Sequence, residues 1–125
     1  MIPRFRAWDK EFKEMVQVDA LVFDEQIIKA TYKNGNVVKE DLKNYILMQS
    51  TGLTDKNGKE IFEGDVVKMA KNVYSEPTCY EVVRHRGGAY RLDSKQYGCE
   101  LWLRHTDCDI AGNIYENPEL LEVSS

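Results

Sequence analysis

The stretch QIIKATYKNGNVVK, residues 26–39, is the strongest fold signal in the chain, because two β-branched segments flank the pair Asn34-Gly35. The side chains before this pair partly alternate between apolar and polar, which is typical of a half-buried strand. An Asn-Gly pair supplies the two positive-φ positions of a type I′ turn, whose twist matches two antiparallel strands. The sequence therefore predicts a β-hairpin with Asn34 and Gly35 in its turn.

Turn chemistry also occurs further along the chain. Asp55, Asn57 and Gly58 suit a tight turn in which Gly58 takes the left-handed bulge position. Gly64 and Asp65 form a bend that leads into a Val-Val strand. Each of these turns separates two apolar segments, so the pattern is one of short strands.

Strands are predicted over residues 2–8, 15–18, 21–23, 45–49, 66–69, 79–84, 89–92, 101–103 and 109–115. An asparagine followed by proline predicts one short helix over residues 117–121. Many short strands joined by tight turns favour a barrel or a sandwich. We therefore predict a mainly β fold: a small SH3-like or related β-barrel, with an N-terminal β-hairpin element and a short C-terminal helix.

The length of 125 residues suits a single domain, residues 1–125. Within it, residues 1–44 are predicted to form an N-terminal β element and residues 45–125 the barrel-like part. The predicted core side chains are Trp8, Ile46, Met48, Ile61, Val66, Val82, Trp102, Ile110 and Ile114.

The composition is that of a globular protein, with 42% hydrophobic and 30% charged residues. No apolar run approaches the roughly 20 residues of a membrane-spanning helix. The first residues lack the apolar region and cleavage site of a signal peptide. We therefore expect a cytoplasmic protein with no membrane partner, whose three cysteines are free thiols rather than a disulfide framework.

Three motifs occur in order along the chain. They are FRAWD at residues 5–9, LMQSTGLTDKNGKEIFEGDVV at residues 47–67 and GNIYENPELL at residues 112–121. Together they resemble the YopX-like family of phage and prophage proteins. Ser50 stands where that family usually has an aromatic residue, and the segments between the motifs match no pattern that we can assign.

The resemblance implies a phage or prophage gene expressed in the cytoplasm of a bacterial host. It also implies a mainly β fold with a barrel-like C-terminal part. It carries over no catalytic residue, since the family has no established activity.

The central motif has two interpretations. Asp55, Asn57 and Asp65 supply oxygen atoms that suit a ligand, but turn chemistry explains each of them. The spacing of an EF-hand and its closing glutamate are absent. We favour the structural interpretation.

Metal binding and catalysis have few candidates. His105 and Cys108 lie three residues apart, and Cys99 lies nearby, but neither spacing that zinc sites use is present. Cys99 or Cys108 beside a histidine is the one nucleophile–base pair that the sequence offers, and no phosphate or dinucleotide loop accompanies it. We predict no metal, no cofactor and no enzymatic activity.

Two binding functions remain. Residues 66–95 carry six Lys/Arg against three Asp/Glu, although the whole chain has a net charge of -4. A nucleic-acid site around the hairpin at residues 84–91 is one hypothesis, in which cations neutralise phosphates and a tyrosine stacks on a base. Its residues are Lys68, Lys71, Arg84, Arg86, Tyr90 and Arg91.

The acidic net charge counts against nucleic acid, so we favour protein–protein assembly. Aromatic residues such as Trp8, Phe12, Phe23 and Trp102 exceed what a loose surface requires, and aromatic anchors concentrate binding energy. The predicted function is a phage or prophage accessory protein that forms a homo-oligomer and binds a protein partner.

Overall fold

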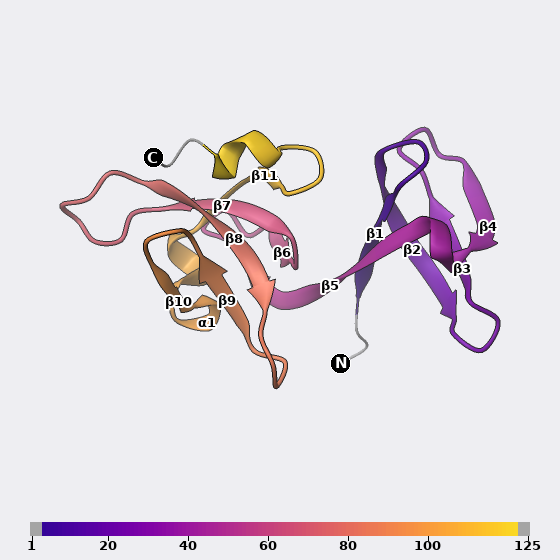
Figure 1. The fold of residues 1–125 in the computed structure, drawn as a ribbon, viewed down its shortest axis with the longest axis horizontal. Helices are drawn as coiled ribbons and strands as arrows, with labels where there is room; N and C mark the ends of the chain where they lie inside the picture. The colour runs from indigo at the N-terminus through magenta and orange to yellow at the C-terminus, as the bar shows by residue number, and fades with distance from the viewer. Residues whose placement is uncertain (1–3, 123–125) are drawn as a thin grey trace. The chain divides into compact units, whose positions relative to one another are not determined.

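A computed structural model describes residues 4–122 and divides the chain into two compact units, residues 1–50 and 51–125 (Figure 1). The boundary lies inside strand β5 (Tyr45–Thr54). The sequence predicts a division between residues 44 and 45. The difference arises because residues 45–49 pair with β1 (Phe5–Asp9) and thereby belong to the first unit's sheet.

The first unit is an antiparallel sheet in the order β4-β3-β2-β1-β5. Its other elements are β2 (Glu14–Val22), β3 (Ile27–Thr31), β4 (Val37–Asp41) and the 3-10 turn η1 (Leu42–Asn44). The predicted opening strand is β1, and residues 2 and 3 of that prediction lie outside the described residues. β5 continues into the second unit, where β6 is its neighbour in the sheet.

The hairpin predicted around Asn34 and Gly35 is confirmed as β3 and β4. The predicted type I′ turn is wrong, because φ is positive at Gly35 (92°) but not at Asn34. Gly35 N–H donates to the Tyr32 carbonyl, and Tyr32 N–H donates to the Asn36 carbonyl. The turn is therefore a longer one closed by a glycine bulge, and the Asn34 side chain supports it by accepting from Asn36 N–H at 2.9 Å.

The two strands predicted over residues 15–18 and 21–23 form the single strand β2. Its register with β3 shifts between Val18 and Ala20, which marks a β-bulge. The extra residue, Asp19, accepts a hydrogen bond from the Thr31 hydroxyl at 2.6 Å. The bulge explains the break in alternation that made one strand look like two.

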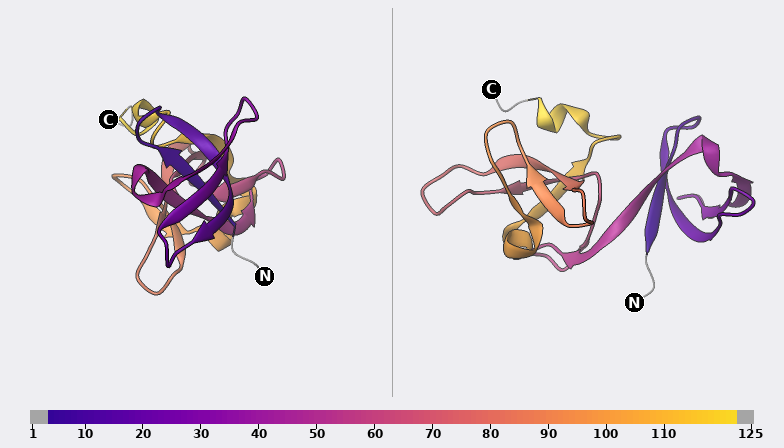
Figure 2. Two further views of the ribbon diagram at one scale, coloured as in Figure 1. Left: turned by 90° about the vertical axis from the view of Figure 1, so that its right-hand side faces the viewer. Right: turned by 60° about the horizontal axis from the view of Figure 1, so that its bottom comes forward.

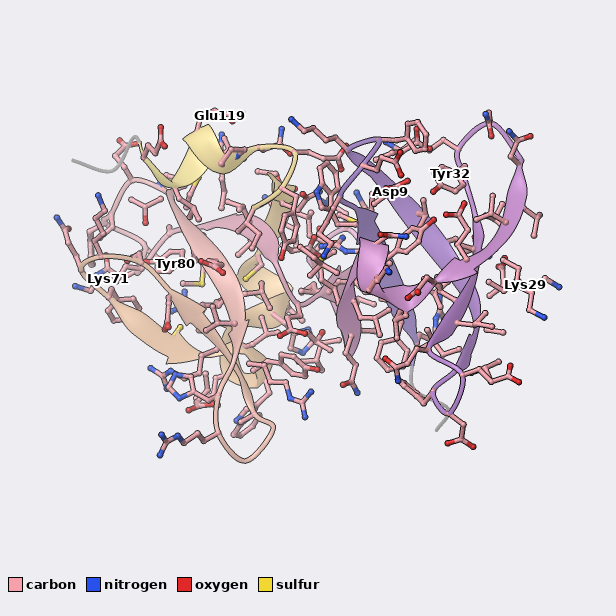
Figure 3. The ribbon with its side chains drawn as sticks, turned by 45° about the vertical axis from the view of Figure 1, so that its right-hand side comes forward. Asp9, Lys29, Tyr32, Lys71, Tyr80 and Glu119 are labelled. Atoms are coloured by element: carbon pink, nitrogen blue, oxygen red, sulfur yellow. The ribbon has the colours of Figure 1, made fainter. Side chains whose placement is uncertain are left out.

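The core of the first unit is apolar except at one end. Its buried members are Ala7, Val16, Ile28, Ala30 and Tyr45. The Tyr32 hydroxyl donates to the buried Asp9 carboxylate and lies 2.7 Å from the Tyr45 hydroxyl (Figure 3). Burial raises the pKa of Tyr32, and its hydrogen bond to Asp9 raises it further. This group joins β1, β5 and the end of β3 through polar contacts.

The second unit contains an antiparallel sheet in the order β10-β9-β8-β7-β11. Its strands are β6 (Glu60–Phe62), β7 (Asp65–Met69), β8 (Thr78–Arg84), β9 (Tyr90–Asp93), β10 (Gly98–Glu100) and β11 (Asp109–Asn113). Its helical elements are α1 (Leu101–Arg104), η2 (His105–Asp107) and η3 (Pro118–Leu121). The mainly β fold and the short C-terminal helix, η3, are confirmed, whereas SH3-like closure stays a prediction.

The core of the second unit lies on one face of that sheet. It comprises Ile61, Val67, Met69, Tyr80, Val82, Leu92, Leu101 and Cys108. Among the predicted core residues, Trp8, Met48, Ile61, Val66 and Val82 are buried, and Ile46, Ile110 and Ile114 are half-buried.

The strand predicted over residues 101–103 is wrong, since these residues begin helix α1. Leu101 is fully buried, while Trp102 is 65% exposed, so its assignment to the core is also wrong. The segment lacks β-branched residues, which leaves it free to adopt a helical turn. One turn places Leu101 in the core and turns the next two side chains outward.

Candidate functional site

The α1 surface, which we define as Trp102 and Leu103, is the candidate site. The two side chains are 65% and 58% exposed and are consecutive in the chain. Leu101 before them is fully buried, and Cys108 after them is also fully buried. Two large apolar side chains thus stand in solvent on a segment that is anchored in the core at both ends.

Arg104 fixes the end of α1. Its guanidinium donates to the Ala70 carbonyl at 2.9 Å and to the Lys71 carbonyl at 3.3 Å. It also donates to Asp107 at 2.9 Å, and this hydrogen bond raises the pKa of Arg104 above its ordinary value. The α1 surface is therefore presented on a rigid turn. A partner that binds there loses little free energy to ordering of the α1 backbone.

The residues of the nucleic-acid hypothesis do not share one face of the sheet. Arg84 pairs with Tyr90, and their neighbours Val83 and Arg91 pair with each other. Because adjacent residues of a strand point to opposite faces, Arg84 and Arg91 are on opposite sides. Lys68 pairs with Cys79 and is on the same side as Arg91, several residues along the sheet.

Arg91 and Tyr90 are engaged within the unit. Arg91 donates to Glu100 at 2.8 Å and lies 3.7 Å from Asp93. Tyr90 packs against the core, and this burial raises the pKa of its hydroxyl. Arg84 and Arg86 remain exposed at the turn. The turn thus exposes two arginines but no fully exposed tyrosine. Nucleic-acid binding at residues 84–91 remains a prediction that depends on Arg84 and Arg86.

The predicted turn residues are held by hydrogen bonds within the unit. Asp55, which is 4% exposed, accepts from the backbone N–H groups of Asn57 and Lys59 at 2.9 Å and of Ile110 at 3.1 Å. Burial by itself opposes ionisation, but these three bonds outweigh it and lower the pKa of Asp55. Gly58 has the predicted positive φ, 81°.

The second predicted bend, at Gly64 and Asp65, is also held by hydrogen bonds within the unit. Gly64 has a φ of 88°, and its carbonyl accepts from Ile114 N–H at 2.9 Å. Buried Asp65 accepts from Phe62 N–H at 2.8 Å. The Asn57 amide donates to Asp109 at 3.1 Å, which ties the first turn to β11.

The metal candidates do not converge. Within residues 4–122, no three His, Cys, Asp or Glu side chains are placed to hold a metal ion. His105 Nδ1 lies 2.7 Å from the Thr54 carbonyl, and the Cys108 thiol donates to the Arg104 carbonyl at 3.4 Å. Burial raises the pKa of Cys108 to about 12 and also raises the pKa of Cys99.

Comparison with known proteins identifies the family. The family model described as YopX protein matches residues 4–122, nearly the whole chain. The chain belongs to the YopX family.

Two solved structures resemble this YopX family member. Protein EF1440 from Enterococcus faecalis is 31% identical, with a TM-score of 0.67 over 97% of this chain and 99% of the other. Protein yopX from Bacillus subtilis is 23% identical, with a TM-score of 0.63 over 94% and 97%, and this likeness shows the fold. None of the curated proteins compared with the chain matches it.

Some exposed residues of this YopX family member were missed in the sequence. Val73 and Tyr74, which are 90% and 95% exposed, lie in the loop between β7 and β8, and Leu103 lies on α1. The loop residues precede Pro77 and follow an asparagine, which signals a turn but not the exposure of its apolar residues. No helix within residues 4–122 has the length and hydropathy to span a membrane.

Proposed function

We propose that this chain is a non-catalytic assembly module that self-associates through the α1 surface and thereby presents a protein-binding oligomer. The observation that carries the proposal is the exposure of Trp102 and Leu103 on an anchored turn. Aromatic side chains held rigidly on a surface are the residues that most often dominate binding energy. The resemblance to phage and prophage proteins supports a role as an accessory protein in the cytoplasm of a bacterial host.

A second copy of the chain suits the α1 surface because the two arginines nearest to it, Arg104 and Arg91, are already in ion pairs. Arg104 is paired with Asp107, and Arg91 with Glu100. Two identical surfaces can therefore meet about a twofold axis without uncompensated like charges facing each other. This charge pairing favours self-association over a strongly charged partner.

The raised pKa values of two cysteine thiols support a non-catalytic role. A cysteine nucleophile needs a lowered pKa, because the thiolate is the reactive form. Burial moves the pKa of Cys99 and Cys108 the other way. These residues suit packing better than nucleophilic attack.

The test is sedimentation velocity of the whole chain over a range of concentrations. We expect wild-type chain to sediment as an oligomer at micromolar concentration. Trp102→Ser with Leu103→Ser should weaken association by about 30-fold or more, since a single hot-spot residue contributes about 2 kcal/mol.

A matched control replaces a more exposed apolar pair elsewhere. Val73→Ser with Tyr74→Ser removes as much exposed apolar surface from a loop and should leave association unchanged. Circular dichroism confirms that both variants fold. A wild-type chain that stays monomeric at every concentration, or a Trp102/Leu103 variant that associates like wild type, would contradict the proposal.

A further inference from the structure

Two loops leave the second unit's sheet at the same end. β7 pairs antiparallel with β8, and β8 pairs antiparallel with β9, so the β7–β8 and β9–β10 connections lie together. We call residues 70–77 and 94–97 the loop end. The β7–β8 connection projects well beyond its strands in Figures 1 and 2. The loop end is opposite to the turn at residues 85–89.

The longer loop carries an exposed aromatic ring, and hydrogen bonds to the Asn72 side chain order the backbone beside it. The Asn72 carboxamide oxygen accepts from Tyr74 N–H at 2.9 Å and from the Ser75 hydroxyl at 3.0 Å. Arg104 secures the base of the loop through the Ala70 carbonyl. Tyr74 is 95% exposed, so its ring is placed by its backbone and remains available on both faces.

The shorter loop adds a second aromatic ring with a cation on it. The Ser94 hydroxyl oxygen accepts from Tyr97 N–H at 3.1 Å, which closes this turn. Tyr97 packs edge-on against buried Tyr80, with ring centroids 6.1 Å apart. The ammonium of Lys71 lies 5.0 Å from the centroid of Tyr97, and Figure 3 shows Lys71 at the margin of the unit with Tyr80 further inside. A lysine that belongs to one loop is thus held by the other.

The charges of the loop end are available for a ligand. Lys71 and Lys95 form no ion pair with any residue in the described part of the chain. Nearby Asp93 is instead close to Arg91. The loop end itself carries these two lysines against Glu76. It therefore combines positive charge with an exposed aromatic ring, which the turn at residues 85–89 does not.

We propose that the loop end binds single-stranded nucleic acid. A base stacks on Tyr74, while Lys71 and Lys95 contact the phosphates on either side. Aromatic stacking accepts any base because every base has a π-face, and lysines track the backbone. Bases in a duplex are already stacked on each other, so a single strand is the form that fits. This activity goes beyond the proposed assembly and uses different residues.

The test is fluorescence anisotropy of a labelled oligothymidine of about 12 nucleotides, a length within the range of single-strand sites. The whole chain is titrated at low ionic strength and then across a salt series. Tyr74→Ala should weaken binding by about 5-fold to 150-fold, which corresponds to the 1–3 kcal/mol found for about one stacked base. Tyr74→Phe keeps the ring and should bind like wild type, as should Val73→Ala beside it.

The lysines have a separate readout. Lys71→Ala with Lys95→Ala should reduce the slope of log K against log salt concentration by about 1.4, because each phosphate contact on a single strand contributes about 0.7. Trp102→Ser with Leu103→Ser should leave the affinity per chain unchanged, which separates this proposal from the proposed assembly.

Three results would overturn the proposal. The first is a wild-type chain that does not bind the oligothymidine at low salt. The second is wild-type affinity in Tyr74→Ala together with lost binding in Arg84→Glu with Arg86→Glu, which would place the site at the turn. The third is equal affinity for polyglutamate, which would show that the lysines bind acidic chains without base stacking.

Discussion

Replacing Asp55 by asparagine should destabilise the second unit strongly, although the two side chains have nearly the same shape. The carboxylate accepts three backbone hydrogen bonds, two on one oxygen from Asn57 and Lys59 and one on the other from Ile110. An asparagine has only one oxygen acceptor. Whichever way it is oriented, an amide NH2 group faces at least one backbone N–H.

The size of the effect follows from those three bonds. One N–H left without an acceptor costs about 1–3 kcal/mol, and two bonds that lose their charge become weaker by about 0.5 kcal/mol each. The free energy of unfolding should therefore fall by about 3 kcal/mol. For a chain of this size, about 4 °C of Tm corresponds to each kcal/mol, so the Tm should fall by about 12 °C.

The same carboxylate predicts a pH dependence. The pKa of Asp55 is lower in the folded chain than the ordinary aspartate value of 3.8. The unfolded chain therefore takes up the proton first as the pH falls, and the stability that Asp55 contributes is present above about pH 4 and lost below it. Because Asp55→Asn does not titrate at this position, its difference from wild type should shrink below about pH 4.

Urea denaturation, monitored by circular dichroism between pH 3 and pH 7, measures both the loss of unfolding free energy and its pH dependence. The matched control is Asp109→Asn, the same chemical change at a more exposed carboxylate that lies 4.0 Å from Lys56. It should cost less than about 1 kcal/mol. A loss below about 1 kcal/mol in Asp55→Asn, or a difference from wild type that does not change with pH, would show that the Asp55 carboxylate does not stabilise the unit through these three hydrogen bonds.

Three further predictions concern other parts of the chain. Gly112→Ala places a Cβ atom 2.2 Å from Asn117 Oδ1 and should lower the free energy of unfolding by about 2 kcal/mol or more, measured in urea. Tyr32→Phe removes the hydroxyl that donates to buried Asp9 and should cost about 1–3 kcal/mol in the same assay; an unchanged midpoint would contradict this. Cys108, fully buried with a pKa raised to about 12, should be the last thiol to react with a disulfide reagent at pH 8; early reaction would show that the core opens.

The turns were predictable because their chemistry is local. Asn34-Gly35 and the stretch from Asp55 to Gly58 carry the acceptors and the glycine that their own backbones need. Even here the type of the first turn was wrong, since the Asn34 side chain closes the turn without a positive φ of its own. A sequence identifies a turn more readily than its dihedral angles, because several turn types use the same residues.

Helix α1 shows where local reasoning fails. Leu101 to Leu103 is apolar at every position, so its pattern does not distinguish a strand from a helical turn. The outcome depends on the pocket that receives Leu101 and on the carbonyl of Ala70, 34 residues before Arg104. Neither is near α1 in the sequence.

The mainly β fold, the positions of most turns and the family resemblance could all be read from the sequence, because these properties depend on neighbouring residues and on ordered motifs. Which charges and aromatic rings are exposed for binding became clear only from the folded chain. Strand pairing placed Arg84 and Arg91 on opposite faces and brought Glu100 to Arg91, while Lys71 came to rest on Tyr97. Exposure and charge pairing depend on residues that are distant in the chain, and only the register of the sheet brings them together.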